Sequence, residues 1–149
     1  MAARSRRVAL TAQEAGFIAH ALTLAPRVLK SATRDLNRRH GLGPHGAWIL
    51  RLIGNGQVVY PLDVTRYFLI GRSLISDELA RLKRAQLIGY RRSAIDGRRV
   101  ELTLTPLGRT VMRQIRAALT RLVASRLAGH SKADVLRFAS VLQAFVLEA

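Results

Sequence analysis

The hydrophobic residues among the first forty positions recur at alternating spacings of four and three, which is typical of one face of a long helix. They are Ile18, Leu22, Ala25, Leu29, Ala32 and Leu36. Before them, Thr11-Ala-Gln-Glu14 has the form of a capping box, in which the threonine hydroxyl and the glutamate carboxylate satisfy free main-chain N–H groups. The pattern predicts a helix over 11–40, followed by Gly41. Pro26 predicts a kink or a brief break inside it, because proline has no N–H to donate.

Three shorter helices are predicted next. The first begins at Pro44 and ends at the Gly-Asn-Gly sequence of 54–56. The second begins at Pro61 and the third covers about 72–85, with the turn Leu-Ile-Gly at 69–71 between them. Two short helices joined by a tight turn that contains glycine are typical of a helix-turn-helix.

The helix predicted over 72–85 has two distinct faces. Its hydrophobic residues Ile75, Leu79 and Leu82 share one face and are expected in a core. The residues on another face near its N-terminal half are Arg72, Ser73 and Ser76. That half of a recognition helix enters the major groove, where serine binds phosphates or bases and arginine binds guanine. An ordinary amphipathic helix with a solvated face would show the same pattern, so this segment alone leaves both interpretations open.

A β-hairpin is predicted directly after this helix. Residues 87–92 form its first strand, 93–99 its tip and 100–104 its return strand. In the return strand Val100, Leu102 and Leu104 alternate with polar residues, so one strand face is expected to pack inward. A hairpin that follows a recognition helix is a wing, the second DNA-contacting element of a winged helix.

Two pairs of arginines flank the hairpin tip: Arg91, Arg92, Arg98 and Arg99. On a wing these cations are expected to lie against DNA phosphates on either side of a groove. Within the tip, Asp96 is expected to bond the neighbouring main chain or to hold the Arg98 guanidinium. A solvated basic hairpin is the alternative interpretation.

Two helices are predicted in the rest of the chain. Thr105-Pro106 combines a favoured N-cap with a favoured first residue and begins the fifth helix. Ser131 and Asp134 cap the sixth. Its apolar residues cover more of its circumference than one core contact requires: Val135, Leu136, Phe138, Ala139, Leu142, Phe145 and Val146.

The charge of the chain is strongly positive. Among 149 residues, 25 are basic and nine acidic, which gives a formal charge of +16. Such an excess favours polyanionic partners, with nucleic acid ahead of anionic membranes. GC-rich coding would explain why the chain has 22 arginines and three lysines, but it does not explain so few acidic residues.

The remaining composition excludes several classes of function. The chain has no cysteine, which excludes disulfides, thiolate metal sites and thiol switches within it. No apolar run approaches the ~18 residues of a membrane span. Gln13, Glu14 and His20 interrupt an N-terminal stretch that otherwise imitates a signal peptide, so we expect a cytoplasmic protein. Four scattered histidines and the lack of a phosphate-binding glycine motif predict no metal, no cofactor and no enzymatic activity.

The stretch from Leu79 to Gly108, LARLKRAQLIGYRRSAIDGRRVELTLTPLG, resembles the MarR family of winged-helix transcriptional regulators. Asp96 and Arg98 match the Asp-x-Arg pair of that family, and Leu104-Thr105 with Gly108 matches its closing Leu-Thr-x-x-Gly. Two departures stand out. Gln86 occupies the place of the usual glycine, and acidic residues occupy 77–78 inside the recognition helix.

The resemblance implies a mainly α-helical fold with a small β wing, in one domain over 1–149. It implies that 11–40 and 106–149 are dimerisation helices and that 44–105 is a winged helix-turn-helix lobe that binds DNA. The implied function is that of a homodimeric repressor on a near-palindromic operator in double-stranded DNA, released by a small, often aromatic, ligand. An architectural DNA-binding protein and a winged-helix module for protein interaction are the alternatives.

Overall fold

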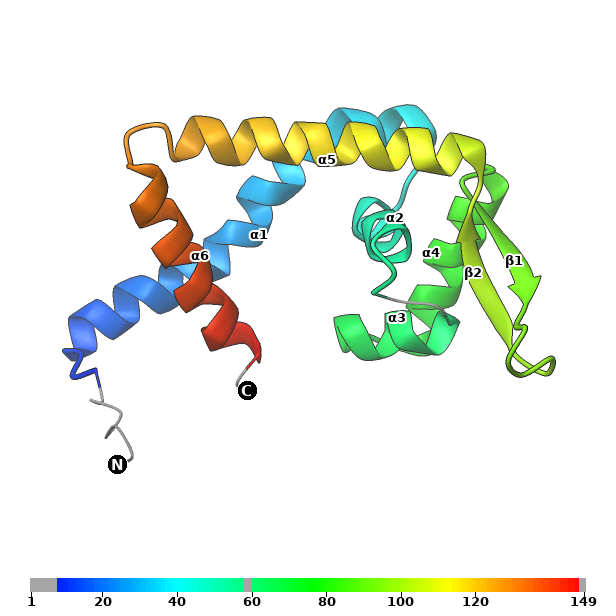
Figure 1. Cartoon of the computed structure of the whole chain (residues 1–149), viewed down its shortest axis with the longest axis horizontal. Coiled ribbons are helices and arrows are strands. Elements are labelled where there is room, and N and C mark those ends of the chain that lie inside the picture. The colour runs from blue at the N-terminus through cyan, green and yellow to red at the C-terminus, as the bar shows by residue number, and fades with distance from the viewer. Residues whose placement is uncertain (1–7, 58–59, 148–149) are drawn as a thin grey trace. The chain divides into compact units, whose positions relative to one another are not determined.

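The computed structural model describes residues 8–57 and 60–147. Over these residues it contains helices and one two-stranded antiparallel sheet (Figure 1). In chain order the elements are α1 (Ala12–His40), α2 (Gly46–Gly54), α3 (Pro61–Phe68), α4 (Arg72–Arg84), β1 (Ile88–Arg92), β2 (Val100–Leu104), α5 (Pro106–Arg126) and α6 (Lys132–Leu147). The predicted fold class, mainly helical with a small β wing, is confirmed.

The chain divides into two compact units, Met1–Ser31 and Ala32–Ala149. The first holds the N-terminal part of α1, where the predicted capping box is present. The Thr11 N–H donates to Glu14 Oε2 at 2.8 Å, and the Glu14 N–H donates to Thr11 Oγ1 at 3.2 Å. Of the kink or brief break predicted at Pro26, the break is absent, since α1 continues through this residue. Proline removes one hydrogen bond from the ladder, and the turns on both sides keep the helical path.

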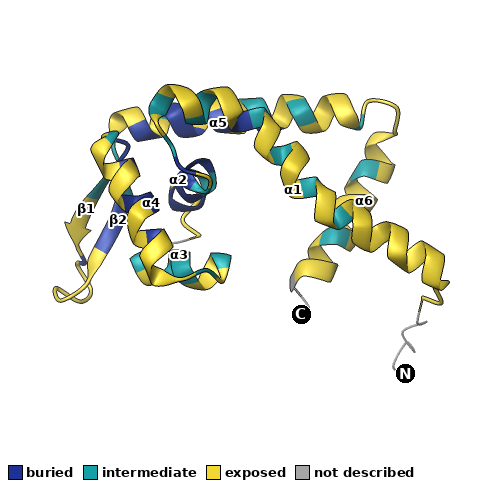
Figure 2. Ribbon diagram, turned by 180° about the vertical axis from the view of Figure 1, so that it is seen from behind, coloured by how far each residue is buried: buried dark blue, intermediate teal, exposed yellow. Residues whose placement is uncertain are grey.

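The core of the second unit lies among α2, α4, the base of the hairpin and the N-terminal half of α5 (Figure 2). Its largest fully buried hydrophobic side chains are Ile49, Leu50, Ile75, Leu82, Leu87 and Ile115. Each such side chain contributes about 1.5–3 kcal/mol when it leaves water. The predicted core residues of α4 are all buried.

Helix α2 begins two residues later than predicted. Pro44 and His45 form a turn in which the Gly46 N–H donates to the Gly43 carbonyl at 3.2 Å. The fixed φ of proline suits a turn as well as a first helical position, which is why the sequence did not separate the two. The linker between α1 and α2 passes close to α4, since a methyl group at Gly43 would overlap the carboxyl group of Glu78.

Helix α4 ends in a turn in which one residue, Gln86, has a strained, positive φ. The Leu87 N–H donates to the Leu82 carbonyl at 3.0 Å and the Gln86 N–H donates to the Lys83 carbonyl at 2.9 Å, which is a Schellman motif. This motif requires positive φ at Gln86, where φ is 56°. Residues with a Cβ are disfavoured in this conformation, and Gln86 is the position where the MarR family usually has glycine.

We predict that Gln86→Gly stabilises the protein. Glycine relieves the left-handed strain, and the gain exceeds its entropic cost in the unfolded chain, so the free energy of unfolding should rise by up to about 1 kcal/mol. Chemical denaturation of the two proteins measures the difference. Gln86→Ala keeps the strain and is the control, and a Gln86→Gly variant no more stable than Gln86→Ala would contradict the prediction.

Candidate nucleic-acid interface

Helix α4 presents the predicted recognition residues to solvent. Gly71 precedes it in an extended conformation, and the α3–α4 turn passes through Leu69 in the left-handed region, with φ 52°. Arg72, Ser73 and Ser76 are all exposed. The opposite face of α4 packs against α2, α3 and β1. Burial of the inner face therefore determines which side chains α4 presents.

The hairpin carries the second group of predicted residues. β1 and β2 pair antiparallel, with Arg91 opposite Glu101 and Arg92 opposite Val100. The Ser93 N–H donates to the Arg99 carbonyl at 2.9 Å and extends the pairing by one step toward the tip.

The Arg91 guanidinium has a cross-strand partner, although the Arg91 side chain is 71% exposed. Its Nη2 lies 2.7 Å from Glu101 Oε2. Hydrogen bonds from Arg91 and Ser93 hold the pKa of the Glu101 carboxyl below its usual value. The predicted strand alternation is wrong at this point, because Glu101 is 9% exposed and Val100 is 43% exposed. The ion pair with Arg91 and the Ser93 hydroxyl give the carboxylate the partners that its burial requires.

The Arg99 guanidinium also has a partner within the protein. It lies 3.7 Å from the ring centroid of Tyr60, the residue that precedes α3. The Tyr60 hydroxyl lies 3.4 Å from Ser93 Oγ, and that oxygen also accepts from the main-chain N–H of Ile95 at 3.3 Å. Tyr60 therefore ties the tip end of the wing to the helix-turn-helix. No sequence signal predicted this contact, because 33 positions separate Tyr60 from Ser93.

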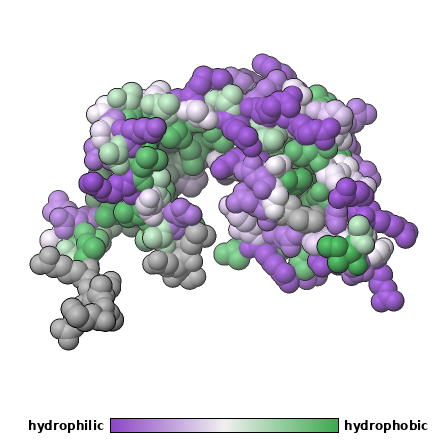
Figure 3. All heavy atoms as spheres, in the orientation of Figure 1, coloured by the Kyte–Doolittle hydropathy of each residue, from purple (hydrophilic) through white to green (hydrophobic). Residues whose placement is uncertain are grey.

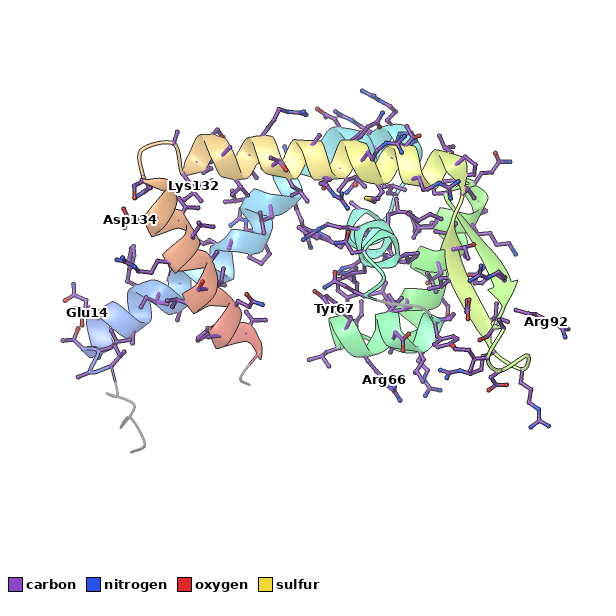
Figure 4. The ribbon with its side chains drawn as sticks, in the orientation of Figure 1. Glu14, Arg66, Tyr67, Arg92, Lys132 and Asp134 are labelled. Carbon is purple, nitrogen blue, oxygen red and sulfur yellow. The ribbon has the colours of Figure 1, made fainter. Side chains whose placement is uncertain are left out.

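Arg92 and Arg98 remain available at the hairpin. Both are exposed, and within the described residues neither guanidinium has a hydrogen bond or an ion pair. Figure 4 shows Arg92 directed away from the ribbon. Of the two roles predicted for Asp96, the main-chain role is present, since Asp96 Oδ1 accepts from the Arg98 N–H at 3.1 Å. The carboxylate shapes the tip and does not hold the Arg98 guanidinium.

The surface around these residues is mostly hydrophilic. In the view of Figure 3, hydrophilic side chains cover most of the visible face of α3, α4 and the hairpin. Arg66 of α3, which the sequence did not single out, is exposed and points away from the core in Figure 4. In the sequence Arg66 is a lone arginine in a short helix, and such a position does not show which face of the helix carries the side chain. The structure thus adds one cation to the predicted set.

Two other features are absent from the part of the chain that the structure describes. Across 8–57 and 60–147, no helix is long and apolar enough to cross a membrane. In the same part of the chain, no three side chains of the metal-binding types gather to hold an ion.

Comparison with known proteins identifies the fold. No protein-family model matches the chain, and no curated protein matches it. Among solved structures, wild-type MarR from E. coli superposes with a TM-score of 0.69 at 16% identity, covering 95% of this chain and 99% of that one. A MarR family protein from Bacillus stearothermophilus gives 0.75 at 16% identity over 94% and 98% of the chains. Bordetella bronchiseptica BpsR, described with regulation of its DNA binding by 6-hydroxynicotinic acid, gives 0.67 at 18% identity over 95% and 98%.

Proposed function

We propose that this chain, which has the winged-helix fold of MarR-family transcriptional regulators, is itself a sequence-specific DNA-binding regulator of that family. The observation that carries the proposal is the pairing of two exposed elements on one scaffold. Helix α4 presents Arg72, Ser73 and Ser76, and the wing presents Arg92 and Arg98 without internal partners. The formal charge of +16 supports the same partner.

In the proposed complex α4 enters the major groove and the wing contacts the flanking minor groove. Arginine and serine on α4 supply base and phosphate contacts. Arg98 at the wing tip reaches a narrow, A·T-rich minor groove, whose negative potential attracts a guanidinium. Arg91 and Arg99 stabilise the wing through contacts within the protein. Arg91 pairs with Glu101, and Arg99 stacks on Tyr60.

The working form is proposed to be a homodimer on a near-palindromic operator. The side chains of α6 support this, because several large hydrophobic ones are exposed in the single chain. They are Leu136, Phe138, Val141, Phe145 and Val146, at 55–66% exposure. Surface of this kind is usually covered by a partner. Residues 11–40 and 106–149 are the proposed dimerisation segments, and 44–105 the proposed DNA-binding lobe.

Control by a small molecule is proposed for a repressor of this kind. The effector would bind the DNA-incompetent conformation more tightly, since a ligand shifts an equilibrium only by its differential affinity. The regulation named for BpsR supports an aromatic acid as the class of effector to test first. The chain has no cysteine, so the signal is not a reaction of its own thiols.

Selection of DNA from a random pool tests the proposal. We expect a near-palindromic sequence with half-sites about one helical turn apart, bound at least ~10³-fold more tightly than random DNA at physiological salt. An architectural DNA-binding protein, which the high charge would also suit, enriches no sequence and shows little preference. Failure to bind any DNA at moderate salt would leave the interaction-module alternative.

We predict that Arg98→Ala weakens binding to the selected DNA by on the order of 1–3 kcal/mol, as expected for loss of a specific contact. Arg91→Ala is the comparison, because it removes the same charge from a side chain whose partner is Glu101; since it leaves the Glu101 carboxylate without that cation, the thermal midpoint of each variant is measured beside its affinity. Binding isotherms at fixed salt measure both. If bulk charge alone mattered, the two variants would lose equal affinity.

The same assay tests Asp96. Asp96→Ala should weaken binding, because the Arg98 N–H loses the acceptor that shapes the tip. On charge alone, removal of an acid from a DNA-binding surface would strengthen binding. An Asp96→Ala variant that binds more tightly than wild type would therefore overturn its positioning role.

A further inference from the structure

The recognition helix carries a buried carboxyl group. Glu78 lies on the inner face of α4 and is only 2% exposed. One of its carboxyl oxygens, Oε2, has no hydrogen-bond partner within the described residues. A buried acid in this state is costly, so such a group calls for an explanation.

The carboxyl group fills a space left by a glycine of the α1–α2 linker. A methyl group at Gly43 would overlap both carboxyl oxygens of Glu78, and one at Gly46 would lie 3.6 Å from Oε2. Leu82, one turn further along α4, would lie 3.5 Å from a methyl group at Gly46. The end of the Glu78 side chain is therefore the point at which α4 meets the linker.

We propose that Glu78 is a positioning residue. Its buried, protonated carboxyl group holds the recognition helix against the α1–α2 linker, and this contact is the seat of the helix. Ionisation of the carboxyl group loosens the seat. This rests on the proposed function, because the consequence is a proton-linked affinity for DNA. Ser76 lies two positions before Glu78 on α4, so a displacement of the helix at Glu78 moves the side chains that contact bases.

The electrostatics of the site agree with the geometry. Burial raises the pKa of the Glu78 carboxyl above its ordinary value of 4.5. His45, through its charge and its main-chain N–H, and Arg81 act in the opposite direction, and Asp77 adds to the rise. Burial is the largest of these causes.

The sign of the pH effect follows from this direction. Between 4.5 and its raised pKa, the folded chain holds the Glu78 proton that the unfolded chain has lost. The contribution of Glu78 to stability is therefore present in acid and is lost as the pH rises through that window. An ionised Glu78 regains water only by moving out of its seat, which weakens DNA binding at the higher pH.

The experiment compares wild type, Glu78→Gln and Asp77→Asn from pH 4.5, the ordinary value of the carboxyl pKa, up to about pH 8. Glutamine keeps the shape of the protonated acid and does not ionise. Asp77 is the exposed neighbour on α4, so Asp77→Asn keeps the Glu78 carboxyl group in place and removes only the smallest of the influences on its pKa. Two quantities are measured at each pH: the thermal midpoint of the free protein and its affinity for the selected DNA.

We expect wild type and Asp77→Asn both to lose affinity as the pH rises, the variant at a slightly lower pH because it lacks the charge of Asp77. Glu78→Gln should lose at least about fivefold less, and its thermal midpoint should gain on that of wild type over the same range. Equal pH dependence of affinity in all three proteins overturns the proposal, whatever the thermal midpoints do.

A readout without DNA keeps this inference separate from the proposed function. If none of the proteins binds DNA, the proposed function fails, and hydrogen exchange of the α4 amides in the free protein tests the seat of the helix. Relative to Glu78→Gln, wild type should exchange faster at the higher pH. Identical exchange in the two proteins at both pH values would overturn the positioning role.

Discussion

Burial of one face of α4 is the constraint on which the rest of this structure depends. Ile75, Leu79 and Leu82 leave water together against α2 and the base of the hairpin, and each contributes about 1.5–3 kcal/mol. Because a helix is rigid, fixing this face also fixes the direction of Arg72, Ser73 and Ser76 on the other. The positive φ of Gln86 is strained, and it ends α4 abruptly. Strand β1 can therefore begin at Ile88, two residues after Gln86.

The four arginines of the wing form two groups, those with a partner within the protein and those without one. Arg91 is neutralised by Glu101 across the strands, and Arg99 stacks on Tyr60 and so ties the hairpin to the start of α3. Asp96 acts on the main chain of the tip. Arg92 and Arg98 are the hairpin arginines whose guanidinium groups have no partner within the described residues, and under the proposed function these are the cations that contact DNA.

The elements of this fold could be predicted from the sequence because they depend on local signals. The capping boxes, the Thr105-Pro106 helix start and the core face of α4 are each set by residues a few positions apart. The contacts that organise the site were not predictable, because they join distant positions. A buried Glu78, its seat on Gly43 and the stacking of Arg99 on Tyr60 depend on which surfaces meet after folding.

The central claim is that α4 and the wing read adjacent grooves of the same DNA. Groove-specific chemical footprinting on the selected duplex tests it most directly, with a major-groove probe and a minor-groove probe applied to the same complex. The account predicts major-groove protection in two half-sites about one helical turn apart, each flanked by minor-groove protection that disappears with Arg98→Ala. Uniform backbone protection without groove preference, unchanged by Arg98→Ala, would contradict it.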